Sequence, residues 1–87
     1  MDEFEPTPVG KFVQALRARL RSDDRNRHCL LKGEISQWKP YASGHTYFSL
    51  RDDDGQISAV IWKGRCRIPD GIQDGQEVLI IGNIDLY

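Results

Sequence analysis

A period-two alternation of apolar and polar residues restricts the fold of this sequence more than any other feature. It recurs in short segments, and the clearest of them runs from Gln56 to Trp62. Successive side chains of a β-strand point to opposite faces, so this alternation is typical of strands that bury one face. The preceding Asp54-Gly55 favours a tight hairpin, because both residue types tolerate the positive φ angles of such turns. We therefore predict a mainly β protein whose strands span 28–36, 45–51, 56–62 and 76–86.

The segment before these strands has a helical period instead. Thr7 can cap a helix N-terminus, and Pro8 suits the first turn because its missing N–H would have no partner there. Apolar residues then recur at steps of three and four, and they are Val9, Phe12, Val13, Leu16 and Leu20. This pattern predicts an amphipathic helix at 7–21 that packs on the sheet through its apolar stripe, preceded by a disordered tail at 1–6.

The order of these elements favours a small β-barrel or a curled sheet. Three meandering strands are followed by a connector, Lys63 to Gly75, and by a long fourth strand. A chain of 87 residues suits one domain with a thin core, since such domains bury only roughly 60% of their unfolded surface. An OB-fold, which is a Greek-key β-barrel, needs five strands. Because the sequence stops at Leu86-Tyr87 without a turn, we interpret it as a piece of a longer protein with a truncated fifth strand.

Charge is distributed unevenly along the chain. The net charge is −1, yet residues 11–67 hold all twelve lysines and arginines against six acidic residues. The acidic residues that remain lie at the two ends of the chain. A basic segment between acidic ends suits a polyanionic partner, and an ordinary solvated surface is the alternative.

Several classes of protein and site are excluded by composition. No apolar run approaches the roughly 18 residues of a membrane helix, and the acidic start differs from a signal peptide, so we expect a cytoplasmic protein without membrane contact. Cys29 and Cys66 form no Cys-x-x-Cys pair, so we expect two free thiols. The acids at 52–54 lack the other ligands of a calcium loop, and we predict a solvated turn and no metal. His45 has no partner spaced for nucleophilic catalysis, and we expect its hydrogen bonds to order the Ser43-Gly44 turn.

Two motifs are characteristic of a known family. They are Gly-Glu-Ile-Ser-Gln-Trp at 33–38 and Ser-Gly-His-Thr-Tyr-Phe-Ser-Leu-Arg-Asp at 43–52. Both closely resemble the N-terminal OB-fold domain of the exodeoxyribonuclease VII large subunit. The likeness extends to Trp62-Lys63-Gly64, to Asp-Gly-Gln-Glu-Val-Leu at 74–79, and to Tyr87. The connector looks slightly shorter than is usual in that family, which affects a loop rather than the predicted binding face.

The resemblance implies both a fold and a function. In such a domain a fifth strand follows the tyrosine and closes the gap between the third and fourth strands. The resemblance also implies a domain that binds single-stranded DNA for a subunit that degrades it, with the catalytic residues and the contacts to the small subunit of exodeoxyribonuclease VII outside this chain. We therefore expect a single-stranded DNA-binding domain that is not itself an enzyme and has no cofactor. A protein-interaction module for subunit or domain assembly is the alternative. Without the fifth strand two edges are unpaired, and we expect self-association through them.

Aromatic rings on the outward faces of two strands are the main candidates for the binding site. Tyr47 and Trp62 are predicted on the face of strands 45–51 and 56–62 where OB-folds commonly bind single strands. Stacking of a base on a ring contributes roughly 1–3 kcal/mol whatever the base. Packing beneath the helix or the connector is the alternative for both rings. The basic residues that follow Trp62 are predicted to hold phosphates, and they are Lys63, Arg65 and Arg67.

Two further groups of residues complete the predicted site. The loop between the first two strands interleaves rings with a positive charge at Trp38, Lys39 and Tyr41, and this loop commonly contacts DNA in OB-folds. Trp38 can instead seal one end of the barrel. Lys32 and Arg51 are predicted to point outward as phosphate contacts, with a solvated surface as the alternative.

Overall fold

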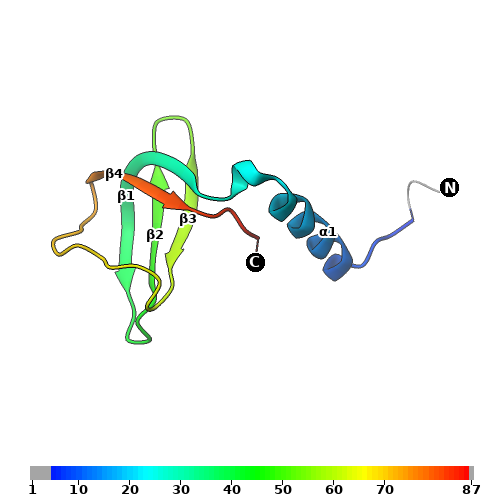
Figure 1. Cartoon of the computed structure of the whole chain (residues 1–87), viewed down its shortest axis with the longest axis horizontal. Coiled ribbons are helices and arrows are strands. Elements are labelled where there is room, and N and C mark those ends of the chain that lie inside the picture. Colours follow the sequence, from blue (N-terminus) through cyan, green and yellow to red (C-terminus); the bar gives the residue numbers. More distant parts are fainter. Residues whose placement is uncertain (1–4, 87) are drawn as a thin grey trace. The chain divides into compact units, whose positions relative to one another are not determined.

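The structure is a computed structural model that describes residues 5–86. Its helix, α1, spans Val9–Ser22 and is followed by a 3₁₀ turn at Asp24–Asn26. The strands are β1 (Cys29–Pro40), β2 (Thr46–Arg51), β3 (Gln56–Ile61) and β4 (Glu77–Gly82) (Figure 1). The chain divides into two compact units, a sheet unit at 31–80 and a helical unit formed by the residues before and after it. Residues 1–4 of the predicted tail, and Tyr87, lie outside the described residues.

The sheet unit has the mainly β structure that the alternation predicts. Its strands form one sheet in the order β3-β2-β1-β4, and β2 pairs antiparallel with both β1 and β3. The predicted hairpin joins β2 to β3, and the Asp52 carboxylate accepts hydrogen bonds from the backbone N–H groups of Asp54 and Gly55 at 2.8 and 2.9 Å. β3 and β4 are the edges of this sheet. Self-association through these edges stays a prediction.

The core lies on the inner face of this sheet and is small. Its buried apolar residues are Ile35, Phe48 and Leu50. Partly buried side chains pack against them, and they are Trp38, Ala59, Ile61, Ile72, Val78 and Ile80. Gly33 allows β1 to approach β2 closely, because a Cβ atom at this position would lie 2.8 Å from the Leu50 side chain. The thin core expected from the length of the chain is therefore present.

β1 is longer than predicted and contains a bulge. The segment 37–40, which we expected to be a loop, continues the strand, and its pairing with β2 shifts just before Lys39. Gln37 adopts a positive φ of 56° at this point. The Asp74 carboxylate accepts hydrogen bonds from the backbone N–H groups of Gln37 (3.1 Å) and Trp38 (2.8 Å). These bonds satisfy two N–H groups at the irregularity, so the strand continues beyond it.

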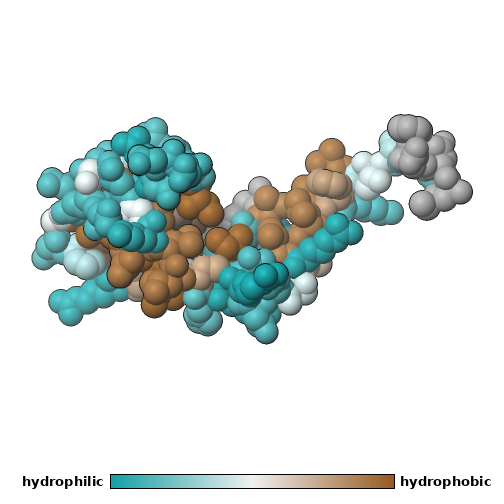
Figure 2. All heavy atoms as spheres, turned by 90° about the horizontal axis from the view of Figure 1, so that it is seen from above, coloured by the Kyte–Doolittle hydropathy of each residue, from teal (hydrophilic) through white to brown (hydrophobic). Residues whose placement is uncertain are grey.

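α1 begins at Val9 rather than at Thr7. Pro8 occupies the N-cap position, and its carbonyl accepts a hydrogen bond from the Phe12 N–H at 3.1 Å. The predicted cap by Thr7 is wrong, because Pro8 has the extended ψ of a cap residue, 139°, and leaves Thr7 outside the first turn. No residue of α1 is buried, and Figure 2 shows apolar surface over this helix. Packing of the apolar stripe on the sheet stays a prediction. Within residues 5–86, no helix has both the length and the apolar character needed to cross a membrane.

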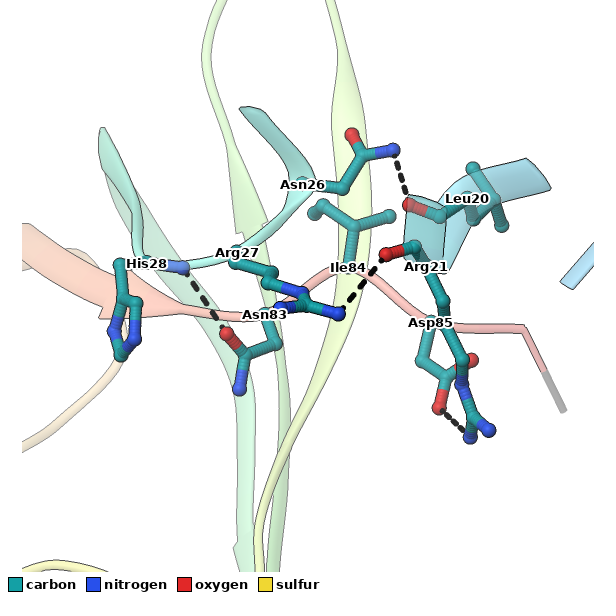
Figure 3. Close-up of a pocket in the computed structure, with 8 residues that line it drawn as sticks. All are labelled: Leu20, Arg21, Asn26, Arg27, His28, Asn83, Ile84 and Asp85. Carbon is teal, nitrogen blue, oxygen red and sulfur yellow. Dashed lines mark hydrogen bonds and ion pairs between the residues drawn. The ribbon is translucent and has the colours of Figure 1, made fainter. Parts of the chain in front are cut away.

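β4 ends at Gly82, short of the predicted end of the fourth strand. Beyond it, the Ile84 N–H donates to the Asn26 carbonyl at 2.8 Å. Arg21 forms an ion pair with Asp85 at 2.9 Å, and the hydrogen bond from Arg21 lowers the pKa of the Asp85 carboxyl (Figure 3). Beyond Gly82 the described residues therefore bond to α1 and to the turn that follows it, and not to a neighbouring strand.

Candidate nucleic-acid interface

Four rings gather on the outer face of β2 and β3 and in the loop before β2. We call Tyr41, His45, Tyr47 and Trp62 the ring cluster. Tyr47 meets two of its neighbours edge-on, with ring centroids 5.3 Å from Tyr41 and 6.4 Å from Trp62. His45 also meets Trp62 edge-on, at 5.1 Å. Tyr41 and Tyr47 are 53% and 43% exposed, so the cluster offers aromatic surface to a ligand.

Strand pairing places two of these rings on one face. Tyr47 pairs with Val60, whereas the neighbouring pair of Phe48 and Ala59 faces the core. Trp62 follows Val60 by two residues and continues the same alternation at the end of β3. Both rings therefore lie on the face that the sequence predicts, and their contact with DNA stays a prediction.

His45 ties the loop before β2 to the end of β3. Its Nδ1 atom accepts a hydrogen bond from the Lys63 N–H at 2.9 Å. Gly44, with a φ of 95°, leaves room for the Lys63 side chain, because a Cβ atom there would lie 2.8 Å from Lys63 Cδ. The turn itself is bonded through the His45 backbone, whose N–H donates to the Ser43 hydroxyl at 3.4 Å. The imidazole thus has a structural role, as expected, but it positions Trp62 and Lys63 rather than the turn.

Four exposed basic side chains lie beside the rings or follow Trp62 along the chain, and they are Lys39, Lys63, Arg65 and Arg67. Lys39 stands opposite Tyr47 in the pairing of β1 with β2. The Arg65 N–H donates to the Trp62 carbonyl at 3.1 Å, and this bond closes a turn at the start of the connector. None of the four forms an ion pair with another described residue. Their charges are therefore available to the phosphates of a bound strand.

The other two predicted phosphate contacts are already paired with carboxylates. Lys32 Nζ lies 3.2 Å from Glu77 Oε1, and Arg51 Nη2 lies 3.3 Å from Glu34 Oε1. Exposed ion pairs contribute roughly 0–1 kcal/mol, so a phosphate can replace either carboxylate at small cost. We expect these two residues to contribute less to binding than the unpaired cations.

Trp38 lies apart from the ring cluster. Its ring packs against Phe48 with centroids 5.2 Å apart, next to the core. The bulge in β1 accounts for this position, because an extra residue in a strand moves the following side chains to the opposite face. Of the two roles considered for Trp38, its position fits the sealing of the core, whereas Lys39 and Tyr41 lie on the outer side with Tyr47.

Asp74 is a positioning residue that we did not single out from the sequence. Its carboxylate holds the bulge after which Lys39 stands opposite Tyr47. The sequence signal at this point is the Asp-Gly pair before β4, which indicates a turn. That signal carries no information about a hydrogen bond to Trp38, which lies 36 residues earlier in the chain.

Replacing Asp74 with alanine is expected to loosen the bulge. Loss of two hydrogen bonds lowers the free energy of unfolding by about 1–3 kcal/mol, and DNA affinity falls because Lys39 and Tyr41 lose their fixed positions. Urea unfolding and a binding titration measure the two effects. Asp70→Ala is the control, because Asp70 is exposed in the same connector and forms no ion pair with a described residue. Unchanged stability and affinity in Asp74→Ala would show that the bulge does not depend on this carboxylate.

A hollow of about 400 Å³ in the helical unit is a second place to consider (Figure 3). Its polar groups are bonded to one another. The Asn83 side chain accepts a hydrogen bond from the His28 N–H at 3.0 Å, and the Asn26 side chain donates to the Leu20 carbonyl at 2.8 Å. These bonds fasten the residues that follow α1 to the end of the helix and to the segment after β4, so we interpret this hollow as structural.

Comparison of the sequence with known proteins identifies a family. A family model described as an OB-fold nucleic acid binding domain matches residues 7–87. The exodeoxyribonuclease 7 large subunit of Chlorobaculum tepidum is 39% identical over 80 residues, which are 91% of this chain and 20% of that protein. The subunit of the same name from Erythrobacter litoralis is 38% identical over 87 residues, or 99% of this chain and 18% of the relative. The subunit of the same name from Lachnoclostridium phytofermentans is 41% identical over 58 residues, which are 66% of this chain and 14% of that protein. The chain thus spans a fifth or less of these relatives.

Proposed function

The chain belongs to the family of OB-fold nucleic acid binding domains, and we propose that the nucleic acid it binds is single-stranded DNA. Membership confirms the predicted fold class, a mainly β OB-fold. The resemblance to the exodeoxyribonuclease VII large subunit, which we inferred from the motifs at 33–38 and 43–52, is confirmed by relatives that match nearly the whole chain. The choice of single strands among nucleic acids rests on the interface.

The observation that carries this proposal is the ring cluster, with four unpaired cations that lie beside it or follow Trp62 along the chain. Aromatic side chains can stack on the face of a base only when the base is not enclosed in a duplex. Every base has such a face, so a surface of this kind binds single strands with little regard to sequence. Lys39 and Lys63 stand beside the rings and supply positive charge for the phosphates on either side of a stacked base.

The proposal extends to the longer protein of which such a domain is part. The domain holds single-stranded DNA for hydrolysis by a catalytic domain that lies outside this chain. Support comes from the relatives, which are named as large subunits of exodeoxyribonuclease 7 and of which the chain spans a fifth or less. We propose that other parts of the longer protein bind the small subunit of that nuclease. We also propose that the nuclease acts in the cytoplasm.

A fluorescence-anisotropy titration with labelled single-stranded DNA at several salt concentrations tests this function. We expect binding that is independent of sequence and weaker for a duplex of equal length. If the four unpaired cations each contact a phosphate, the logarithm of the association constant should fall with the logarithm of salt concentration with a slope of about −3, at roughly −0.7 per contact. Lys63→Met should make this slope less steep by about 0.7, because one phosphate contact is lost. The methionine keeps the side-chain stem that packs on Gly44.

The control for that variant is Lys11→Met, which removes one charge from the exposed surface of α1. Its slope should equal that of the unmodified chain. A slope near zero, or a preference for duplex DNA, would contradict the proposal. Absence of any DNA binding would favour the alternative, a module that assembles subunits or domains.

A further inference from the structure

A hollow lies beside the ring cluster on the outer face of the sheet. Its volume is about 280 Å³, close to the lower end of the roughly 300–1,000 Å³ that small-molecule sites occupy. The hollow therefore suits one ring system rather than a longer stretch of ligand. Besides Phe48 and Ala59, its lining has two tyrosine rings, one positive charge and three uncharged polar side chains, which are Tyr41, Tyr47, Lys39, Gln37, Ser49 and Ser58. No carboxylate of a described residue lines it.

The polar side chains of this hollow form a short hydrogen-bonded row. Ser49 is only 5% exposed, and its hydroxyl donates to Gln37 Oε1 at 3.4 Å and accepts from Gln56 Nε2 at 3.3 Å. Ser58 stands opposite Ser49 in the pairing of β2 with β3. Among residues 5–86, neither the Ser58 hydroxyl nor the Gln37 amide nitrogen has a hydrogen-bond partner. An amide donor and a hydroxyl that both donates and accepts are thus open to a ligand.

We infer that this hollow receives one unpaired nucleobase of the bound strand, an inference that rests on the proposed function. The base contacts the exposed ring of Tyr47, and its polar edge bonds to Ser58 and to the amide of Gln37. Lys39, at the side of the hollow, lies where the phosphate of the same nucleotide can reach it. An apolar side chain is a poorer occupant, because it would cover these polar groups and leave them without partners.

This hollow shares Tyr41 and Tyr47 with the ring cluster, and it adds polar side chains that a stacking surface lacks. Stacking occurs at any ring that the strand passes, whereas a hollow for one base gives one nucleotide position a special role. Because a hydroxyl can rotate to donate or to accept, the hollow tolerates different bases but not the loss of a base. The affinity of a short strand should therefore depend on which of its positions lacks a base.

The test is a series of strands that each lack one base. The shortest oligonucleotide that binds with full affinity is used, so that only one alignment on the protein is possible, and an abasic sugar is moved through every position. We expect one position at which loss of the base weakens binding about ten-fold more than at the others. An equal loss at every position would overturn the inference while leaving DNA binding itself in place. Absence of binding by the complete strand would instead overturn the proposed function.

A variant that fills the hollow gives a second measurement. Ser58→Leu should weaken binding of the complete strand to the level of the critical abasic strand, and it should leave the affinity for that abasic strand unchanged. The unchanged affinity also shows that the variant is folded. Ser22→Leu, which places the same side chain at the exposed end of α1, is the matched control and should bind like the unmodified chain. If Ser58→Leu still distinguishes the complete strand from the abasic one, the base does not enter this hollow.

Discussion

Trp62→Ala is expected to weaken the binding of single-stranded DNA by roughly 1–3 kcal/mol, or about 5- to 150-fold, and to leave the domain folded. The ring lies at the end of β3 on the outer face, in contact with His45 and Tyr47 rather than with the buried core. Its removal takes away a stacking surface next to Lys63. Anisotropy titration measures the loss of affinity, and thermal unfolding measures the stability of the same variant.

Trp62→Phe is the control for this prediction, because it keeps a ring at the same position. We expect it to recover most of the affinity that alanine loses. If Trp62→Ala instead lowers the melting temperature sharply while the folded fraction binds DNA normally, Trp62 supports the fold and is not a stacking surface.

Phe48→Ala is expected to have the largest effect on stability, a loss of about 3–5 kcal/mol from the free energy of unfolding. Domains of this kind are stable by only about 5–15 kcal/mol, so the variant should lose a large part of its stability. The reason is the small size of the core, in which Phe48 joins Ile35 and Leu50 and supports the ring of Trp38. Urea unfolding followed by tryptophan fluorescence measures the change.

The neighbouring residue on the same strand provides a matched control. Tyr47 is also a large ring, but it is exposed on the outer face and pairs with Val60 there. Tyr47→Ala should therefore cost little stability and reduce DNA affinity, the reverse of Phe48→Ala. Equal losses of stability in the two variants would show that the two faces of β2 have been assigned wrongly.

Local alternation was sufficient to predict much of the sheet. On β2 it separates Phe48 and Leu50, which are buried, from Tyr47, which is exposed. The Asp54-Gly55 pair likewise predicts the hairpin, because the turn depends only on residues within it. The outward positions of Tyr47 and Trp62 follow from the same rule, so the centre of the candidate site was accessible from the sequence.

The features that the sequence did not predict depend on residues far apart in the chain. Continued alternation from Glu34 would place Trp38 on the outer face, but the bulge held by Asp74 turns it toward Phe48. After β4, similarly, the Ile84 N–H bonds to Asn26 and Asp85 pairs with Arg21, both of which lie more than fifty residues earlier in the chain. The hollow beside the ring cluster depends on three strands at once, so no single segment of the sequence carries a signal for it.

The connector between β3 and β4 is fastened at both ends, by the bond from Lys63 to His45 and by the bonds from the β1 bulge to Asp74. Within it, the exposed thiol of Cys66 stands between two arginines, whereas the less exposed Cys29 thiol donates to the Arg25 carbonyl. A thiol-reactive fluorophore should therefore attach to Cys66 in preference. The dye would report the arrival of a strand optically, from a loop whose two ends are hydrogen-bonded to the sheet.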